Sequence, residues 1–189
     1  MSEEAMQYPI APGRSCGTCT LCCKVLEIKV LDKPPGVWCP DCKPGSGCMV
    51  YASRPRECSN FYCAYLTNPQ IGEEWKPSHA KIVVAYELDG KRIAAYVDPQ
   101  RPNAWRQEPY YSTLKRWAEA AVPERGQVLV CVGRRTTIVF PDRDVDLGVV
   151  GEDELILTHE RTTPLGVQLE ASKIHKDDPR AKAPPGANG

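Results

Sequence analysis

Residues 81–97 read KIVVAYELDGKRIAAYV, and this stretch decides the class of fold. Two runs of apolar and β-branched residues flank Asp89-Gly90, a pair that favours the type I′ turn of a tight β-hairpin. Such side chains fit the pleated surface of a sheet. We therefore predict two antiparallel strands here, joined at Asp89 and Gly90.

A helix is predicted next, over residues 110–122, YYSTLKRWAEAAV. Apolar residues recur there at helical spacing along one face: Leu114, Trp117, Ala118, Ala121. Ser112 is the expected N-cap, because its hydroxyl can accept from a free N–H of the first turn. One clear helix therefore follows the hairpin.

Further strands are predicted beyond the helix. Residues 127–140, QVLVCVGRRTTIVF, read as two strands joined near Gly133, and residues 153–160 and 166–172 read as two short strands. We interpret 141–146, PDRDVD, as a solvated turn. Residues 67–174 are thus expected to form an α+β region with a mainly antiparallel sheet.

Composition limits the remaining choices. The 189 residues are 42% hydrophobic, enough for a core, and the formal net charge of +0 provides no field that would attract nucleic acid or an anionic membrane. No apolar run approaches the roughly 20 residues of a membrane span. Residues 1–14 carry no secretory signal and are expected to be flexible, as is the polar tail 175–189. A cytoplasmic location with reduced thiols is expected.

Ten cysteines give the chain its asymmetry, since nine of them precede residue 64 and only Cys131 lies beyond. Residues 15–66 contain many Pro and Gly breakers and no periodic apolar face, so their order must come from another source. Within CGTCTLCC, each Cys-x2-Cys step can turn two sulfurs toward one metal ion, and Gly17 suits such a turn. We predict that 15–66 form a metal-binding module, packed on the sheet, that folds only with metal.

The adjacent pair Cys22-Cys23 bears on the number of ions. Neighbouring side chains point in different directions, so two ions are expected, which either take one sulfur each or share a bridging sulfur; the zinc thus occupies one or two four-cysteine sites. Eight thiolates would complete two four-sulfur zinc sites carrying about −4 in total. The predicted ligands are Cys16, Cys19, Cys22, Cys23, Cys39, Cys48, Cys58 and Cys63. Nearby cations that would offset the charge are Arg14, Lys24, Lys43, Arg54 and Arg56.

The order of these cysteines resembles the YkgJ-like cysteine-cluster family, described as a zinc- or iron-chelating domain with the pattern CxxCxxCC. The family pattern continues with Cys-Pro, with Cys-x-(Ile/Val)-Tyr, and with Arg-Pro-x-x-Cys followed by a cysteine five positions on. This chain is similar at Cys39-Pro40, at CMVY (48–51), and at RPREC (54–58) followed by Cys63. Ser59 and Tyr62 stand where the family usually has Arg and Pro. The resemblance covers about 50 residues and implies metal chelation, without a specific activity.

Alternatives remain open at this point. A disulfide framework requires an oxidising compartment. Cys-x2-Cys-x2-Cys also occurs in ferredoxins, so an iron–sulfur cluster competes with zinc. Cys42 lies outside the family pattern. As part of CPDC, Cys42 could belong to a second metal-binding turn and replace one of the eight ligands, or it could have no ligand role. We expect no ligand role for Cys42, as for Cys131 in its apolar strand.

Three functions follow as expectations: a structural or interaction role around zinc, redox or electron transfer through an iron–sulfur cluster, and chelation or delivery of a metal ion. No catalytic constellation stands out, so we lean against an enzyme. His79, His159 and His175 show no metal-type spacing. The metal ion is the partner expected; the sequence does not indicate a protein partner, nucleic acid or membrane.

Overall fold

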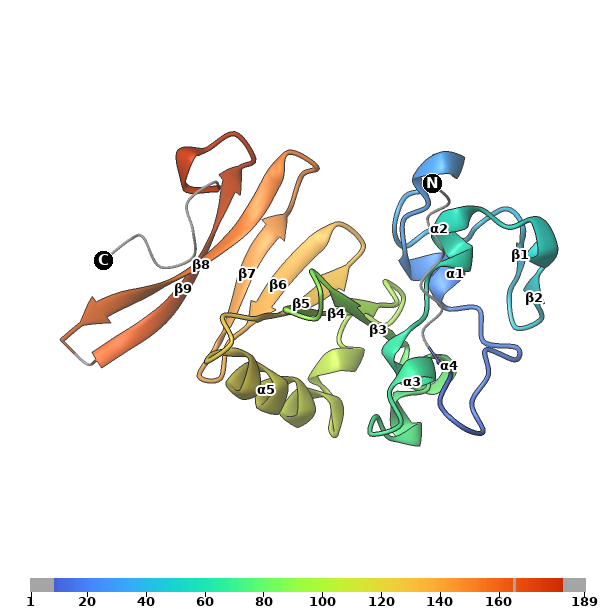
Figure 1. The fold of residues 1–189 in the computed structure, drawn as a ribbon, viewed down its shortest axis with the longest axis horizontal. Coiled ribbons are helices and arrows are strands. Elements are labelled where there is room, and N and C mark those ends of the chain that lie inside the picture. The colour runs from blue at the N-terminus through green and yellow to red at the C-terminus, as the bar shows by residue number, and fades with distance from the viewer. Residues whose placement is uncertain (1–8, 165, 182–189) are drawn as a thin grey trace.

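The computed structural model describes residues 9–164 and 166–181 and has the predicted α+β architecture (Figure 1). A central sheet has the order β3-β4-β5-β6-β7, in which only β4 and β5 are parallel. The pairs β1-β2 and β8-β9 form separate two-stranded sheets. The strands are β1 (Cys42–Lys43), β2 (Gly47–Cys48), β3 (Ile82–Glu87), β4 (Arg92–Val97), β5 (Gln127–Val132), β6 (Arg135–Val139), β7 (Asp144–Val149), β8 (Glu154–Thr163) and β9 (Gly166–His175).

Helices are short except for α5, which has 12 residues. The other α-helices in the described ranges have 4 residues each. They are α1 (Cys22–Val25), α2 (Arg56–Ser59), α3 (Ala64–Thr67), α4 (Pro77–Ala80) and α5 (Tyr110–Ala121). The 3-10 turns are η1 (Lys29–Leu31), η2 (Tyr51–Ser53), η3 (Glu73–Trp75), η4 (Ala104–Arg106) and η5 (Pro179–Ala181).

The β3-β4 hairpin confirms the prediction for residues 81–97. Its register sets Glu87 opposite Arg92, the pairing that a turn centred on Asp89-Gly90 gives. Three residues of the turn have left-handed backbone angles, whereas a type I′ turn has two: Leu88 (φ 50°), Asp89 (φ 54°) and Gly90 (φ 85°). The loop therefore consists of the four residues between the paired ends.

Helix α5 lies where the sequence predicts it, but Ser112 is not its N-cap. The helix begins at Tyr110, with Pro109 in the N-cap position. The Ser112 hydroxyl instead donates to the Glu108 carboxylate at 2.5 Å. The first residue of the helix is held by a ring contact, because Tyr110 packs edge-on against Trp75 with ring centroids 5.0 Å apart.

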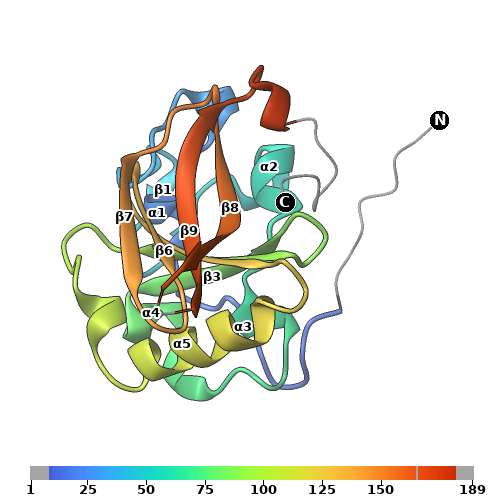
Figure 2. The same ribbon diagram turned by 90° about the vertical axis from the view of Figure 1, so that its left-hand side faces the viewer.

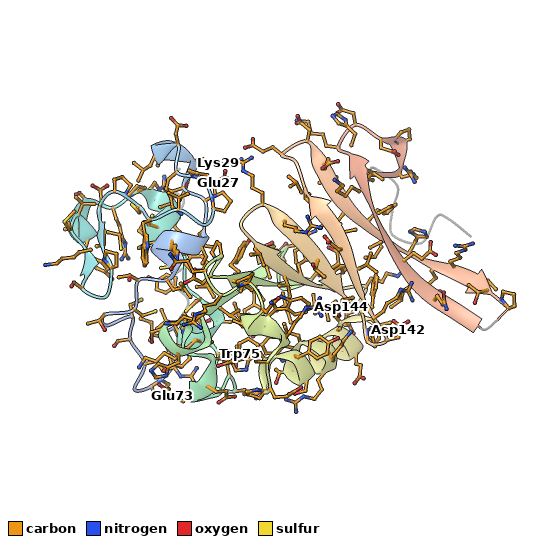
Figure 3. All side chains as sticks on the ribbon, turned by 180° about the vertical axis from the view of Figure 1, so that it is seen from behind. Glu27, Lys29, Glu73, Trp75, Asp142 and Asp144 are labelled. Atoms are coloured by element: carbon orange, nitrogen blue, oxygen red, sulfur yellow. The ribbon has the colours of Figure 1, made fainter. Side chains whose placement is uncertain are left out.

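Strand β7 corrects the interpretation of residues 141–146 as a turn. Asp144 begins β7. Its carboxylate accepts hydrogen bonds from the Lys115 ammonium at 2.8 Å, the Tyr111 hydroxyl at 3.1 Å and the Arg106 guanidinium at 3.2 Å. Figure 3 shows Asp144 beside α5. These contacts tie the last strand of the sheet to the helix. Strands β8 and β9, with 10 residues each, are also longer than predicted.

Two cores cover the two faces of the sheet. On one face, Leu114 and Ala118 of α5 are buried in the main core with Val128 and Val130 of β5. On the other face, the β8-β9 hairpin covers a second core (Figure 2). That core contains Leu129, Ile138 and Phe140, with Ile156, Leu169 and Ala171 of the hairpin packed against it.

The cysteine-rich module packs on the sheet at the β3 edge, where α3 contacts β3. A buried ion pair adds a second attachment: Lys24 and Asp98 are 3% and 7% exposed, with their charged atoms 2.6 Å apart. The Lys24 ammonium also donates to Gln100 Oε1 at 2.9 Å. The module therefore shares a buried polar contact with the end of β4.

The chain ends were expected to be flexible, and residues 1–8 and 182–189 lie outside the described ranges. Of the described part, Arg14 donates to the Asn68 carbonyl at 2.7 Å just beyond α3, and residues 175–181 include the end of β9 and η5. In residues 9–164 and 166–181, no helix has both the length and the apolar character needed to cross a membrane.

Candidate metal centre

A cavity of about 440 Å³ lies in the cysteine-rich module. Its walls come from the turns and short elements between Ser15 and Leu66, with Val83 of β3 as a further wall. All nine cysteines of this segment line it: Cys16, Cys19, Cys22, Cys23, Cys39, Cys42, Cys48, Cys58 and Cys63. The fold thus brings the eight predicted ligands, and Cys42 with them, around one space.

Packing separates most of these cysteines into two sets. The first set is Cys63, buried in the main core, with Cys19 and Cys22 packed against that core. Cys16 joins this set through the turn in which the Cys19 N–H donates to its carbonyl. The second set is Cys39 and Cys42, buried together with Ile28, with Cys23 and Cys58 packed against them. The apolar packing therefore divides the adjacent pair Cys22-Cys23 between the sets, while the hydrogen bond between their thiols keeps the two sets in contact.

Tight turns hold the sulfurs of each set. In the first, the Cys19 N–H donates to the Cys16 carbonyl at 2.8 Å, and Gly17 has φ +50°, a conformation that suits glycine. In the second, the Cys42 N–H donates to the Cys39 carbonyl at 3.1 Å. The Cys39 N–H in turn donates to the Cys23 carbonyl at 3.0 Å. The Cys16–Cys19 and Cys39–Cys42 steps are thus turns of the kind that metal-binding loops use.

Burial favours the protonated form of the thiols. It raises the pKa of Cys63 to about 11 and that of Cys42 to about 12. A hydrogen bond with the Cys22 thiol, and then burial, raises the pKa of Cys23. An ion that binds here must displace these protons, because thiolates are the metal ligands.

The thiols surround the cavity without converging on one point. Among residues 9–164 and 166–181, no three His, Cys, Asp or Glu side chains form a group close enough to hold a metal ion. The donor set nevertheless fits the ions considered, because four soft sulfurs per set match the preferences of both zinc and iron–sulfur clusters.

Two cations lie beside the thiols. Lys33 is 4% exposed and donates to the Lys24 carbonyl at 3.0 Å. Burial lowers its pKa, and the thiols of Cys39 and Cys23 oppose that change. Arg54 stacks on Tyr51 and opposes the rise that burial causes in the pKa of Cys16. The sequence signalled Arg54 but not Lys33, which lies in a Pro-rich loop.

Two of the other predicted cations have other partners. Lys24 faces Asp98, and Arg14 faces the carbonyls that end α3. None of the three histidines, all in the described ranges, lines the cavity. His159 lies 3.5 Å from Glu170 and His175 lies 3.4 Å from Asp177, so both belong to the rear of the chain.

Cys131 lies outside the cavity, in β5, where it packs against the core beneath the β8-β9 hairpin. Its sulfur is 3.9 Å from the Thr136 hydroxyl, and burial raises its pKa to about 11. We expect Cys131→Ala to lower the free energy of unfolding by only about 1 kcal/mol, because it removes one small buried group. Metal content, measured by elemental analysis, should be unchanged; its loss would place Cys131 in the centre.

Comparison with known proteins adds no relative: no family model matches the chain, and no match was found among the curated proteins or the solved structures.

Proposed function

We propose that this chain is a metal-binding protein in which zinc, held by two four-cysteine sites, organises the cysteine-rich module for a structural or interaction role. One observation carries the proposal: nine cysteines line a single cavity, and seven of them pack as two sets. Each set supplies enough thiolates for one tetrahedral ion, and the division of Cys22 and Cys23 between the sets matches two ions. The resemblance to the cysteine-cluster family points the same way.

Folding gives the metal its role in this proposal. The second set has few apolar residues of its own, chiefly Ile28 and Leu31, so packing contributes little there. Zinc bound by thiolates supplies folding free energy in modules of this kind, because the unfolded chain has no preformed site. Lys33 and Arg54 reduce the negative charge that the thiolates would leave.

An iron–sulfur cluster with a redox role is the second candidate, and a specific observation favours it. Cys16, Cys19 and Cys22 have the spacing of the first three ligands of bacterial ferredoxins. Cys63 packs in the same set and supplies the fourth thiolate that such a cluster needs. The first set is thus the place where the cluster would bind.

Elemental analysis of protein purified without oxygen tests the proposal. We expect about two zinc equivalents per chain, because eight thiolates complete two four-sulfur sites. Iron with a matching amount of sulfide, and a brown colour of the protein, would instead support the iron–sulfur cluster. Protein that contains no metal and takes none up from added zinc would contradict both.

A further inference from the structure

Cys42 and Cys48 compete for one position in the second set. Nine cysteines line the cavity, whereas two four-sulfur sites use eight. The first set has four members, which leaves Cys23, Cys39, Cys42, Cys48 and Cys58 for the second ion. One of these five thiols is therefore left over, and the sequence pattern alone names Cys42 as the one outside.

The structure indicates the opposite choice. Cys42 is 8% exposed and forms one buried cluster with Cys39 and Ile28, whereas Cys48 is only half-buried and lies outside that cluster. Cys23 packs against the same buried cluster. The Cys42 backbone is tied to Cys39 by the 3.1 Å turn bond. Cys42 thus has sulfur neighbours on both sides within the second set.

Cys48 nonetheless stays within reach of the same ion. It is the direct partner of Cys42 across the two-residue β1-β2 ladder, and side chains of directly opposed residues stand on one face with Cβ atoms about 5 Å apart. It also lines the cavity, and its charge acts on the pKa of Cys58. A spare thiol beside a filled four-sulfur site can exchange with a bound one.

We propose that Cys42, not Cys48, is the fourth ligand of the second ion, and that Cys48 is an exchange ligand which makes this ion the more readily released of the two. The inference rests on the proposed function. In the exchange step, the Cys48 thiol releases a proton to water and its thiolate binds the ion. The departing Cys42 thiolate then takes up a proton, so charge and atoms balance. A thiol of an acceptor protein or small molecule would enter by the same route.

Single-cysteine variants with zinc as the probe test the ligand assignment. We expect Cys48→Ser to keep about two zinc equivalents. Cys42→Ser, in which Cys48 takes the vacated position, should hold its second ion more weakly, and Cys42→Ser combined with Cys48→Ser should keep about one equivalent. Cys131→Ser is the matched control and should keep both. Circular dichroism of the sheet shows that each variant is folded, and the sulfur-to-cobalt absorption after Co²⁺ substitution counts thiolates per ion independently of zinc content.

Zinc release to a chromogenic chelator tests the exchange role. The unmodified protein should release its ions in two phases, and Cys48→Ser should slow the faster phase while the slower one keeps its rate. An unchanged fast phase would overturn the exchange role. Loss of an ion in Cys48→Ser, or two ions retained in the double variant, would overturn the assignment of Cys42. Absence of bound metal in the unmodified protein would instead contradict the proposed function itself.

Discussion

Chelation of the metal should remove amide protection from most of residues 15–66, while residues 81–98 and 127–140 keep much of theirs. The central strands lie between two apolar cores that contain no predicted ligand other than Cys63, Cys19 and Cys22. The second set, by contrast, has a small cluster around Ile28. Zinc contributes about 10–16 kcal/mol to folded zinc-finger peptides, a loss that so small a cluster cannot offset.

Hydrogen exchange read by mass spectrometry, with and without chelator, measures this difference segment by segment. Within the module, α1 and α3 should lose less protection than the loops between them. Leu21 and Val25 at α1, and Ala64 and Leu66 in α3, are buried in the main core. Equal protection of the whole chain before and after chelation would show that metal does not organise the module.

Lys24→Met should lower the free energy of unfolding by about 3–5 kcal/mol, the usual cost of removing one partner from a buried ion pair. The Asp98 carboxylate would stay buried, 7% exposed, without the ammonium that now lies 2.6 Å away. Gln100 would lose a hydrogen bond as well. Urea denaturation followed by circular dichroism gives the change in free energy.

The exposed pair Lys29–Glu152 supplies the matched control for this variant. Both side chains are 64% exposed, so Lys29→Met should cost no more than about 1 kcal/mol. Asp98→Asn added to Lys24→Met should recover part of the loss, because the amide oxygen still accepts the Gln100 N–H without a buried charge. Equal costs for the two lysine variants would show that the buried pair does not fasten the module to the sheet.

Much of the fold follows from local pattern. The hairpin at 82–97, the helix and the pair β5-β6 show in the sequence because each alternates or repeats its apolar residues with the period of its own structure. The sequence does not indicate strand β7, although Val145 and Leu147 alternate, since Asp142, Asp144 and Asp146 resemble the residues of a turn. Its order depends on contacts made by Asp144 with α5, which are distant in sequence.

The candidate centre divides in the same way. Spacing identifies the sulfurs, because Cys-x2-Cys forms its turn from local hydrogen bonds alone. Which sulfurs share a set depends on packing: Cys63 joins Cys19 only because α3 packs into the main core. Lys33 and Cys42 likewise acquire their positions from tertiary burial. No local pattern carries that information.

The β8-β9 hairpin has a consequence for the handling of the protein. It connects to β7 through residues 150–153, which include exposed positions open to proteases. A cut there would allow the hairpin to dissociate and would uncover Leu129, Ile138 and Phe140 together. An apolar sheet face of that kind promotes self-association. Nicked preparations would therefore precipitate while their cysteine-rich segment remained chemically intact.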